Sequence, residues 1–255
     1  MTATADTRGT RSAGDDTLAD ILRRLSGAQK GAAGAPAYSR FVNRKFGRLL
    51  AALAFRAGLT PNTVTAISAA FTATGIALLA LHAPTVGMAL AVGACLIVGY
   101  AFDAADGQLA RLRGGGSPAG EWLDHMVDAV KIASLHLSLL VGLYRFGGIH
   151  HGPLLLVPLG FSVVSVVLFF GTLLNEALRA QHGAPTRAQR TDERPGVLRS
   201  VLVVPTDYGL LCLVFLLLGV PAVFFPVYTA LFAATAAYLG LASVKWFREM
   251  GRLAG

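Results

Sequence analysis

Long apolar runs separated by short polar links occupy most of this 255-residue chain. A helix needs about 20 apolar residues to cross a hydrocarbon core about 30 Å thick. Six stretches approach or exceed that length, and the predicted spans are 61–82, 86–109, 119–144, 153–175, 206–220 and 222–243. The pattern predicts an all-α integral membrane protein with six transmembrane helices.

The segment before the first span has a different pattern. Over residues 38–58 apolar and basic side chains alternate at helical spacing, which predicts an amphipathic helix on the membrane interface. Its apolar set is Phe41, Leu49, Leu50, Leu53 and Phe55, and its basic set is Arg40, Arg44, Lys45, Arg48 and Arg56. This helix and the six spans form one predicted membrane domain over 37–250.

Residues 1–36 are rich in Gly, Ala, Ser, Thr and charge, with room for one short helix at 17–29. Such a composition buries too little apolar surface to order itself, so we expect a flexible cytoplasmic tail. Four aspartates between Asp6 and Asp20 interrupt the segment, and no apolar core follows them. We therefore do not expect a signal peptide.

The distribution of charge predicts the orientation. Charged residues make up 14% of the chain, against about 25% in ordinary globular domains. Of the 22 Lys and Arg residues, all but Lys131 and Arg145 fall on one side if six spans alternate in direction. Because short cytoplasmic loops collect Lys and Arg, we expect a multi-pass cell-membrane protein with both termini in the cytoplasm. The basic residues flank spans rather than forming a stripe on a soluble domain, so no nucleic-acid partner is expected.

Four aspartates interrupt the apolar pattern where the second span ends and the third begins. Asp103 and Asp106 are three residues apart, and Asp124 and Asp128 are four apart, so each pair shares one helical face. The intervening Arg-Gly-Gly-Gly-Ser-Pro segment predicts a tight turn between antiparallel helices. All four carboxylates are therefore expected to converge on the cytoplasmic side.

Clustered acids at membrane depth need compensation, because one unpaired charge costs about 2.5–3.5 kcal/mol on insertion scales. An all-carboxylate ligand set suits Mg²⁺, which Mn²⁺ can replace, better than Zn²⁺. Glu121, in the first turn of its helix, is instead interpreted as a solvated cap. His125 is expected to face away from the acids.

The aspartates belong to a longer motif, D-x2-D-G-x2-A-R-x8-G-x3-D-x3-D. Its fixed positions are Asp103, Asp106, Gly107, Ala110, Arg111, Gly120, Asp124 and Asp128. This is the signature of the CDP-alcohol phosphotransferases, and the chain resembles that family over about residues 38–250. The Leu59-Thr60-Pro61-Asn62-Thr63-Val64-Thr65 segment before the first span is also similar to the family's.

The resemblance implies transfer of a phosphatidyl-type group from a CDP-linked lipid donor to the hydroxyl of a polar alcohol, with release of CMP. It implies that Asp103, Asp106 and Asp124 hold Mg²⁺ and that Asp128, beside the metal, is the general base. By analogy the donor site is lined by Asn62, Thr65, Gly107, Ala110, Arg111 and Gly120. Thr65 has an alternative, since Thr often bonds its own helix backbone. A homodimer is expected on the same resemblance.

The acceptor is less determined. Arg179, Arg194 and Arg199 resemble positions where inositol-phosphate-using members bind their acceptor, and Lys131 is a further candidate. However, Asn175-Glu176-Ala177 stands where those members usually have a lysine, and loop arginines also follow from the positive-inside rule. Inositol phosphate and glycerol-3-phosphate are both open, as is a neutral or cationic alcohol. Lys131 could instead extend toward the headgroups.

A divalent-cation transporter or channel is the alternative from another class, since such proteins also use intramembrane acids. It predicts acids spread along a pathway through the bilayer. Here they cluster at one end beside a glycine pattern suited to a nucleotide. Cys95 and Cys212 have no partner pattern and are expected to be buried, reduced thiols.

Overall fold

The computed structural model describes residues 17–27, 36–148, 152–185 and 203–253. Every regular element in those ranges is helical, which confirms the all-α prediction. Five helices are long and apolar enough to cross a membrane. They are α3 (Pro61–Leu81), α4 (Val86–Leu112), α5 (Pro118–Phe146), α6 (Leu156–Gln181, after the 3₁₀ turn η2, Pro153–Leu155) and α9 (Pro221–Gly251).

The predicted span at 206–220 is not a full-length helix. A 3₁₀ turn, η3 (Val204–Thr206), leads into α8 (Tyr208–Phe215), which Asp207 caps by accepting from the Gly209 amide. Beyond Phe215 the backbone tightens, because the amides of residues 216–218 bond to carbonyls three residues back. Five of the described helices meet the length and composition of a membrane span, and a sixth span at 206–220 stays a prediction.

The short α8 follows only part of α4. Its Tyr208 ring meets the Tyr100 ring edge-on at 5.0 Å, and the turns after it reach Val86, where α4 begins. The chain from α8 to the start of α9 therefore runs along the first half of α4.

The starts of α3, α4 and α5 are fixed by local caps. Thr60, Thr85 and Ser117 each accept a hydrogen bond from the backbone amide three residues on, which satisfies a donor at a helix start. Pro61 and Pro118 follow two of these caps. Gly114 and Gly115 have φ of 98° and 131° in the turn before α5, a conformation that favours glycine.

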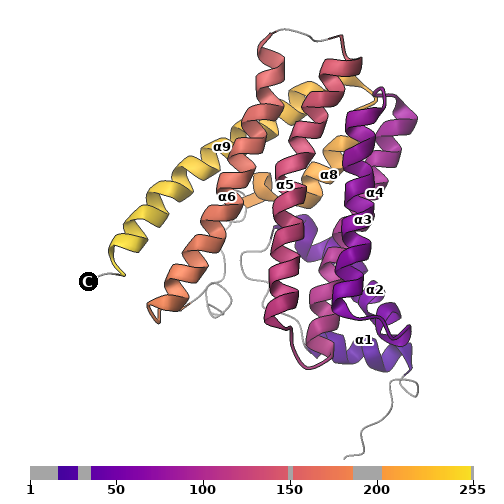
Figure 1. Cartoon of the computed structure of the whole chain (residues 1–255), viewed down its shortest axis with the longest axis vertical. Helices are drawn as coiled ribbons and strands as arrows, with labels where there is room; N and C mark the ends of the chain where they lie inside the picture. The colour runs from indigo at the N-terminus through magenta and orange to yellow at the C-terminus, as the bar shows by residue number, and fades with distance from the viewer. Residues whose placement is uncertain (1–16, 28–35, 149–151, 186–202, 254–255) are drawn as a thin grey trace, which may run out of the picture.

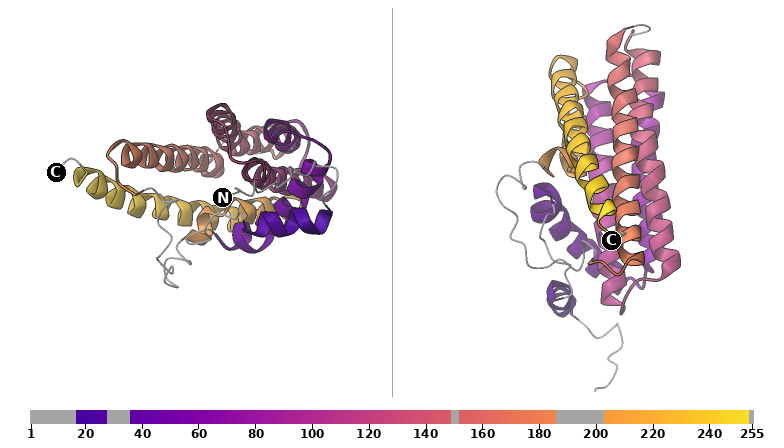
Figure 2. Two further views of the ribbon diagram at one scale, coloured as in Figure 1. Left: turned by 90° about the horizontal axis from the view of Figure 1, so that it is seen from below. Right: turned by 90° about the vertical axis from the view of Figure 1, so that its left-hand side faces the viewer.

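The helices pack around a closed ring. Contacts run from α4 to α3, α5, α6, α9, α8 and back to α4. Figure 1 shows the long helices from the side, and Figure 2 includes an end-on view. Direct packing between α4 and α5 is sparse in the described residues, so α3 and the polar side chains between them hold this pair together.

A polar contact inside the membrane bundle joins three helices of the ring. The His136 ring on α5 lies 2.6 Å from the Tyr228 hydroxyl on α9 and 3.3 Å from the Ser165 hydroxyl on α6. The same ring stacks on Phe161 at 4.0 Å. Such hydrogen bonds stabilise helix association where water is absent.

The predicted interfacial helix is observed in two parts, a π-helix η1 (Ser39–Asn43) and α2 (Arg44–Arg56). It packs on α4, and side-chain amides of Asn43 and Gln108 bond backbone carbonyls across the contact. Its small residues Ala51, Ala52 and Ala54 are buried. The large apolar residues Phe41, Phe46, Leu49 and Leu53 point outward. The outward apolar face suits contact with lipid, and its depth in a bilayer stays a prediction.

Part of the predicted flexible tail is packed. Leu18–Gly27 forms α1, with Ile21 and Leu25 fully buried against α2 and α4. Arg24 also lies over the Phe55 ring at 5.7 Å. The short helix predicted within 17–29 is therefore found, and two apolar side chains at i and i+4 pack it against its neighbours. The flexibility of the tail as a whole stays a prediction. The rest of 1–36 falls almost entirely outside the described residues.

Candidate active site

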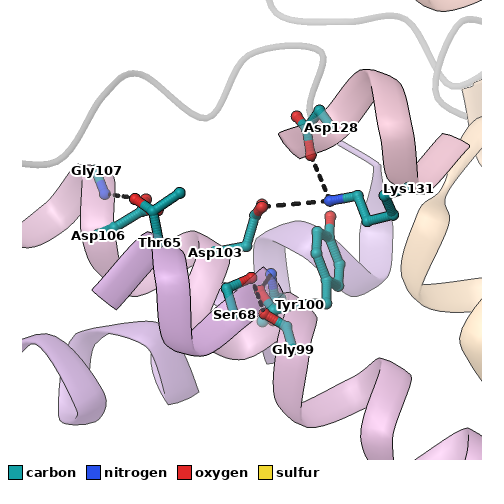
Figure 3. A network of polar contacts seen from close by, with 10 residues as sticks. Thr65, Ser68, Gly99, Tyr100, Asp103, Asp106, Gly107, Asp128 and Lys131 are labelled. Atoms are coloured by element: carbon teal, nitrogen blue, oxygen red, sulfur yellow. Dashed lines mark hydrogen bonds and ion pairs between the residues drawn. The ribbon is translucent and has the colours of Figure 1, made fainter. Parts of the chain in front are cut away.

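The four aspartates come from the adjoining ends of α4 and α5, within about three turns of the glycine turn. Asp103 lies within electrostatic range of both Asp124 and Asp128, and Asp106 of Asp103 and Asp124. Figure 3 shows three of them, with Asp103 between Asp106 on one side and Asp128 on the other. The predicted convergence is found. No acids extend along α4 or α5 toward their far ends.

Asp106 is held by donors from α3 and from its own helix. The Thr65 hydroxyl lies 2.6 Å from one carboxylate oxygen, and the Gly107 amide lies 2.5 Å from the other. Asp106 is only 6% exposed. The Thr65 hydroxyl also lies 3.1 Å from the Pro61 carbonyl, so the backbone contact raised as the alternative is present, and donor binding by Thr65 stays a prediction.

Lys131 occupies the other side of the cluster. Its ammonium forms ion pairs with Asp103, at 3.3 Å, and with Asp128. Lys131 is 7% exposed and its ammonium lies over the Tyr208 ring at 5.0 Å. The alternative in which this side chain extends toward the headgroups is wrong in this structure, because two buried carboxylates hold it.

His125 lies nearer the acids than expected. One ligand atom each from Asp124, His125 and Asp128 falls within 4.8 Å of the others. The His125 ring is also 6.4 Å from Phe169, and its Nε2 is 3.9 Å from Glu121. The expectation that His125 faces away is wrong, since its place between two acids on one helix keeps a ring nitrogen beside them.

The predicted donor residues come from three helices: Asn62 and Thr65 from α3, Gly107, Ala110 and Arg111 from α4, and Gly120 from α5. A Cβ atom at Gly120 would come within 3.2 Å of the Asn62 side-chain oxygen, which brings the starts of α3 and α5 together. A Cβ at Gly107 would lie 3.5 Å from the Arg111 guanidinium. The Arg111 Nε is buried without a hydrogen-bond partner in the described structure. Ala110 precedes it and is half-buried.

The predicted acceptor residues are only partly placed. Arg179 ends α6, is 9% exposed, and pairs with Glu249 of α9 at 2.5 Å. Arg194 and Arg199 lie outside the described residues. Lys131 is therefore the one acceptor candidate that is placed against the acids.

Sequence reasoning missed two features. One is Tyr208, which opens α8 and underlies Lys131. The other is an open pocket of about 320 Å³ beside it, lined by residues of α5, α6, η3, α8 and α9 that include Ile132, Phe161 and Leu168. No sequence motif predicts the place of Tyr208 or the pocket, because both depend on how helices distant in sequence pack together.

The residues present suit a divalent cation. They offer carboxylate oxygens, the ligands that Mg²⁺ and Mn²⁺ prefer, from two helices that pack little against each other. Two of these carboxylates already bind one cation, the ammonium of Lys131. The donor set therefore fits the group, whereas a zinc site would call for more His or Cys.

A family model for CDP-alcohol phosphatidyltransferase matches residues 58–244, which contain all four aspartates and all five long helices except the end of α9. The chain belongs to the CDP-alcohol phosphatidyltransferase family. No individual curated protein matches it in sequence. As a member, it is a membrane transferase of substituted phosphate groups that takes a phosphatidyl group from a CDP-alcohol in phospholipid synthesis, and its family generally uses a divalent metal.

Proposed function

We propose that the protein is a Mg²⁺-dependent CDP-alcohol phosphatidyltransferase that moves a phosphatidyl-type group from a CDP-linked lipid to the hydroxyl of a polar alcohol, releasing CMP. The observation that carries the proposal is the meeting of Asp103, Asp106, Asp124 and Asp128 at the adjoining ends of the apolar helices α4 and α5. A channel would instead favour acids spread along the helices.

Mg²⁺ would be held by the four aspartates, and Mn²⁺ could replace it. When bound, such an ion neutralises charge on the transferring phosphoryl group and on the departing CMP oxygen. His125 is a neighbour of two of these ligands, and a ring nitrogen would supplement a set made mainly of oxygens.

Donor binding is assigned to Asn62, Thr65, Gly107, Ala110, Arg111 and Gly120. The bare backbone of Gly107 lets the Arg111 guanidinium lie close beside Asp106, and that of Gly120 lets the Asn62 side chain approach α5. The unpartnered Arg111 Nε–H supports a role on the donor phosphates, since a guanidinium binds phosphate oxygens through a planar set of donors. The lipid chains of the donor would lie between helices.

Asp128 is assigned as the general base. It would accept the proton of the acceptor hydroxyl while that oxygen forms a bond to the donor phosphorus and the bond from phosphorus to the CMP oxygen breaks. The ion pair with Lys131 holds the Asp128 carboxylate beside Asp103. No covalent enzyme intermediate is required.

The acceptor is proposed to be polar and anionic, with inositol phosphate and glycerol-3-phosphate as the candidates. Arg179, Arg194, Arg199 and Lys131 are the proposed acceptor residues. Arg179 is already engaged by Glu249, so an acceptor phosphate would have to replace that carboxylate. The basic segments support a cell-membrane protein with both termini and the active site on the cytoplasmic side. A homodimer is proposed on the family resemblance alone.

The test is release of CMP from a CDP-linked diacyl lipid by the purified protein in detergent, with candidate alcohols supplied one at a time. We expect CMP release that requires both the alcohol and Mg²⁺, that EDTA abolishes, and that Mn²⁺ restores. Activity unaffected by EDTA would remove Mg²⁺ from the proposal. Activity with an uncharged alcohol only would remove the anionic acceptor.

A further inference from the structure

Lys131 is a buried cation bound to two of the carboxylates that the proposed function assigns to the metal. Its ammonium pairs with Asp103 of α4 and Asp128 of α5, and thereby bridges two helices that otherwise pack little against each other. Figure 3 shows the ammonium between the two carboxylates. A buried lysine needs such partners, because an isolated charge in an apolar interior is strongly disfavoured.

One ammonium and a divalent ion cannot both hold the same carboxylate oxygens without cost. Two like charges about 4 Å apart repel strongly wherever water is largely excluded. Two of the four proposed metal ligands, Asp103 and Asp128, are held by Lys131. A metal ion held by all four aspartates would therefore have to weaken the ion pairs of Lys131.

We propose that Lys131 is a built-in counter-cation: it neutralises Asp103 and Asp128 before metal binds, and it competes with the divalent ion for these two ligands. The proposal rests on the proposed function only in assigning the aspartates to the metal. It assigns Lys131 a role beyond the acceptor contact suggested by sequence.

Tyr208 already contacts the ammonium while it pairs with the carboxylates, and would be its remaining partner after metal binds. Its ring face lies 5.0 Å from the Lys131 Nζ, within the range of a cation–π contact. Its hydroxyl is buried and has no hydrogen-bond partner in the described structure, with the weakly bonding Cys212 thiol as a neighbour. Lys131 therefore can stay inside the helix ring after it releases the carboxylates.

The test measures Mg²⁺ affinity by calorimetry and by Mg²⁺-dependent melting of the full chain in detergent, without substrates. Lys131→Met keeps the length of the side chain and removes its charge. We expect it to bind Mg²⁺ at least about tenfold more tightly than the original protein. In the variant Mg²⁺ no longer has to break the charged hydrogen bonds of Lys131, and one such bond changes an affinity by about tenfold or more. Without metal it should melt at a lower temperature, because the acids lose their counter-cation.

Two matched variants separate this role from a general effect of charge. Lys131→Arg keeps the cation and should bind Mg²⁺ within about threefold of the original protein. Lys245→Met removes an exposed lysine that pairs with Glu249 at 3.7 Å, and should leave Mg²⁺ affinity unchanged. An unchanged or weaker Mg²⁺ affinity in Lys131→Met would overturn the proposal.

A second pair of variants does not depend on folding of the lysine mutant. Tyr208→Leu removes the ring that receives the ammonium and should weaken Mg²⁺ binding about threefold, whereas Tyr208→Phe keeps the ring and should not. Equal affinity of these two variants would contradict the proposed exchange. Asp106→Asn, at an acid that Lys131 does not touch, tests the metal site itself. Absence of Mg²⁺ binding in the original protein would overturn both proposals, while normal binding that Lys131 does not influence would overturn only this one.

Discussion

The hydroxyl of Thr65 on α3 donates a 2.6 Å hydrogen bond to the carboxylate of Asp106 on α4. Because Thr65 lies one turn after the Pro61 start of α3, the contact ties the beginning of one helix to the acid-bearing end of another. It also fixes one carboxylate oxygen while the Gly107 amide fixes the other. Asp106 is therefore oriented before any ligand binds.

Thr65→Val should lower kcat/KM for the CDP-linked donor about tenfold or more. The variant keeps the shape and removes a hydrogen bond to a charged group, which contributes about 1.5–3 kcal/mol. Thr65→Ser should recover most of the activity. Thr74→Val on the same helix is the control, because the Thr74 hydroxyl bonds only its own backbone at Ala70. Equal kinetics in the two valine variants would show that the contact does not orient Asp106.

Replacing Asp103, Asp106 or Asp124 singly with Asn should abolish transfer and weaken the dependence of the remaining activity on Mg²⁺. An amide has a similar shape but lacks the negative charge that a hard divalent cation prefers. CMP release measured across a Mg²⁺ titration checks this. Glu121→Gln, at an exposed acid in the first turn of α5, should keep its activity. Turnover at the original rate in any of the three Asn variants would remove that residue from the metal ligands.

Asp128→Asn should bind the nucleotide donor and fail in the chemical step, with a loss of about 10²–10⁴ in kcat. The amide keeps the side chain in place but cannot take a proton at neutral pH. Donor affinity measured by calorimetry, beside single-turnover CMP release, separates binding from chemistry. If donor affinity falls as far as it does in Asp103→Asn, Asp128 is mainly a metal ligand.

The Arg179–Glu249 ion pair predicts that substitutions of its two members change the acceptor KM in opposite directions. Arg179→Ala should raise the acceptor KM about tenfold or more and change the donor KM little, because a charged hydrogen bond to a phosphate is lost. Glu249→Gln should lower the acceptor KM, since the competing carboxylate is gone. Arg194→Ala and Arg199→Ala should follow Arg179→Ala. Arg248→Ala, at an exposed position near Glu249, is the control. A larger change in donor KM than in acceptor KM would show that these arginines do not bind the acceptor.

Much of the architecture could be predicted from the sequence because local rules determine it. Apolar runs of sufficient length became α3, α4, α5, α6 and α9. Caps at Thr60 and Ser117, each followed by proline, set where two of them begin. The spacing of the aspartates placed them on shared faces, and a short glycine turn kept the two faces at one end of the bundle.

Other features required the tertiary structure. The apolar run at 206–220 became the short α8, and Ile21 and Leu25 docked a segment whose composition predicts flexibility. Burial of Lys131 against Asp103 depends on residues 28 positions apart, and the Arg179–Glu249 pair on residues 70 apart. Periodicity reports only which face of a helix a residue occupies. The partner across that face is decided by how helices distant in sequence pack. Burial removes water from a charged side chain, which then needs an opposite charge close by.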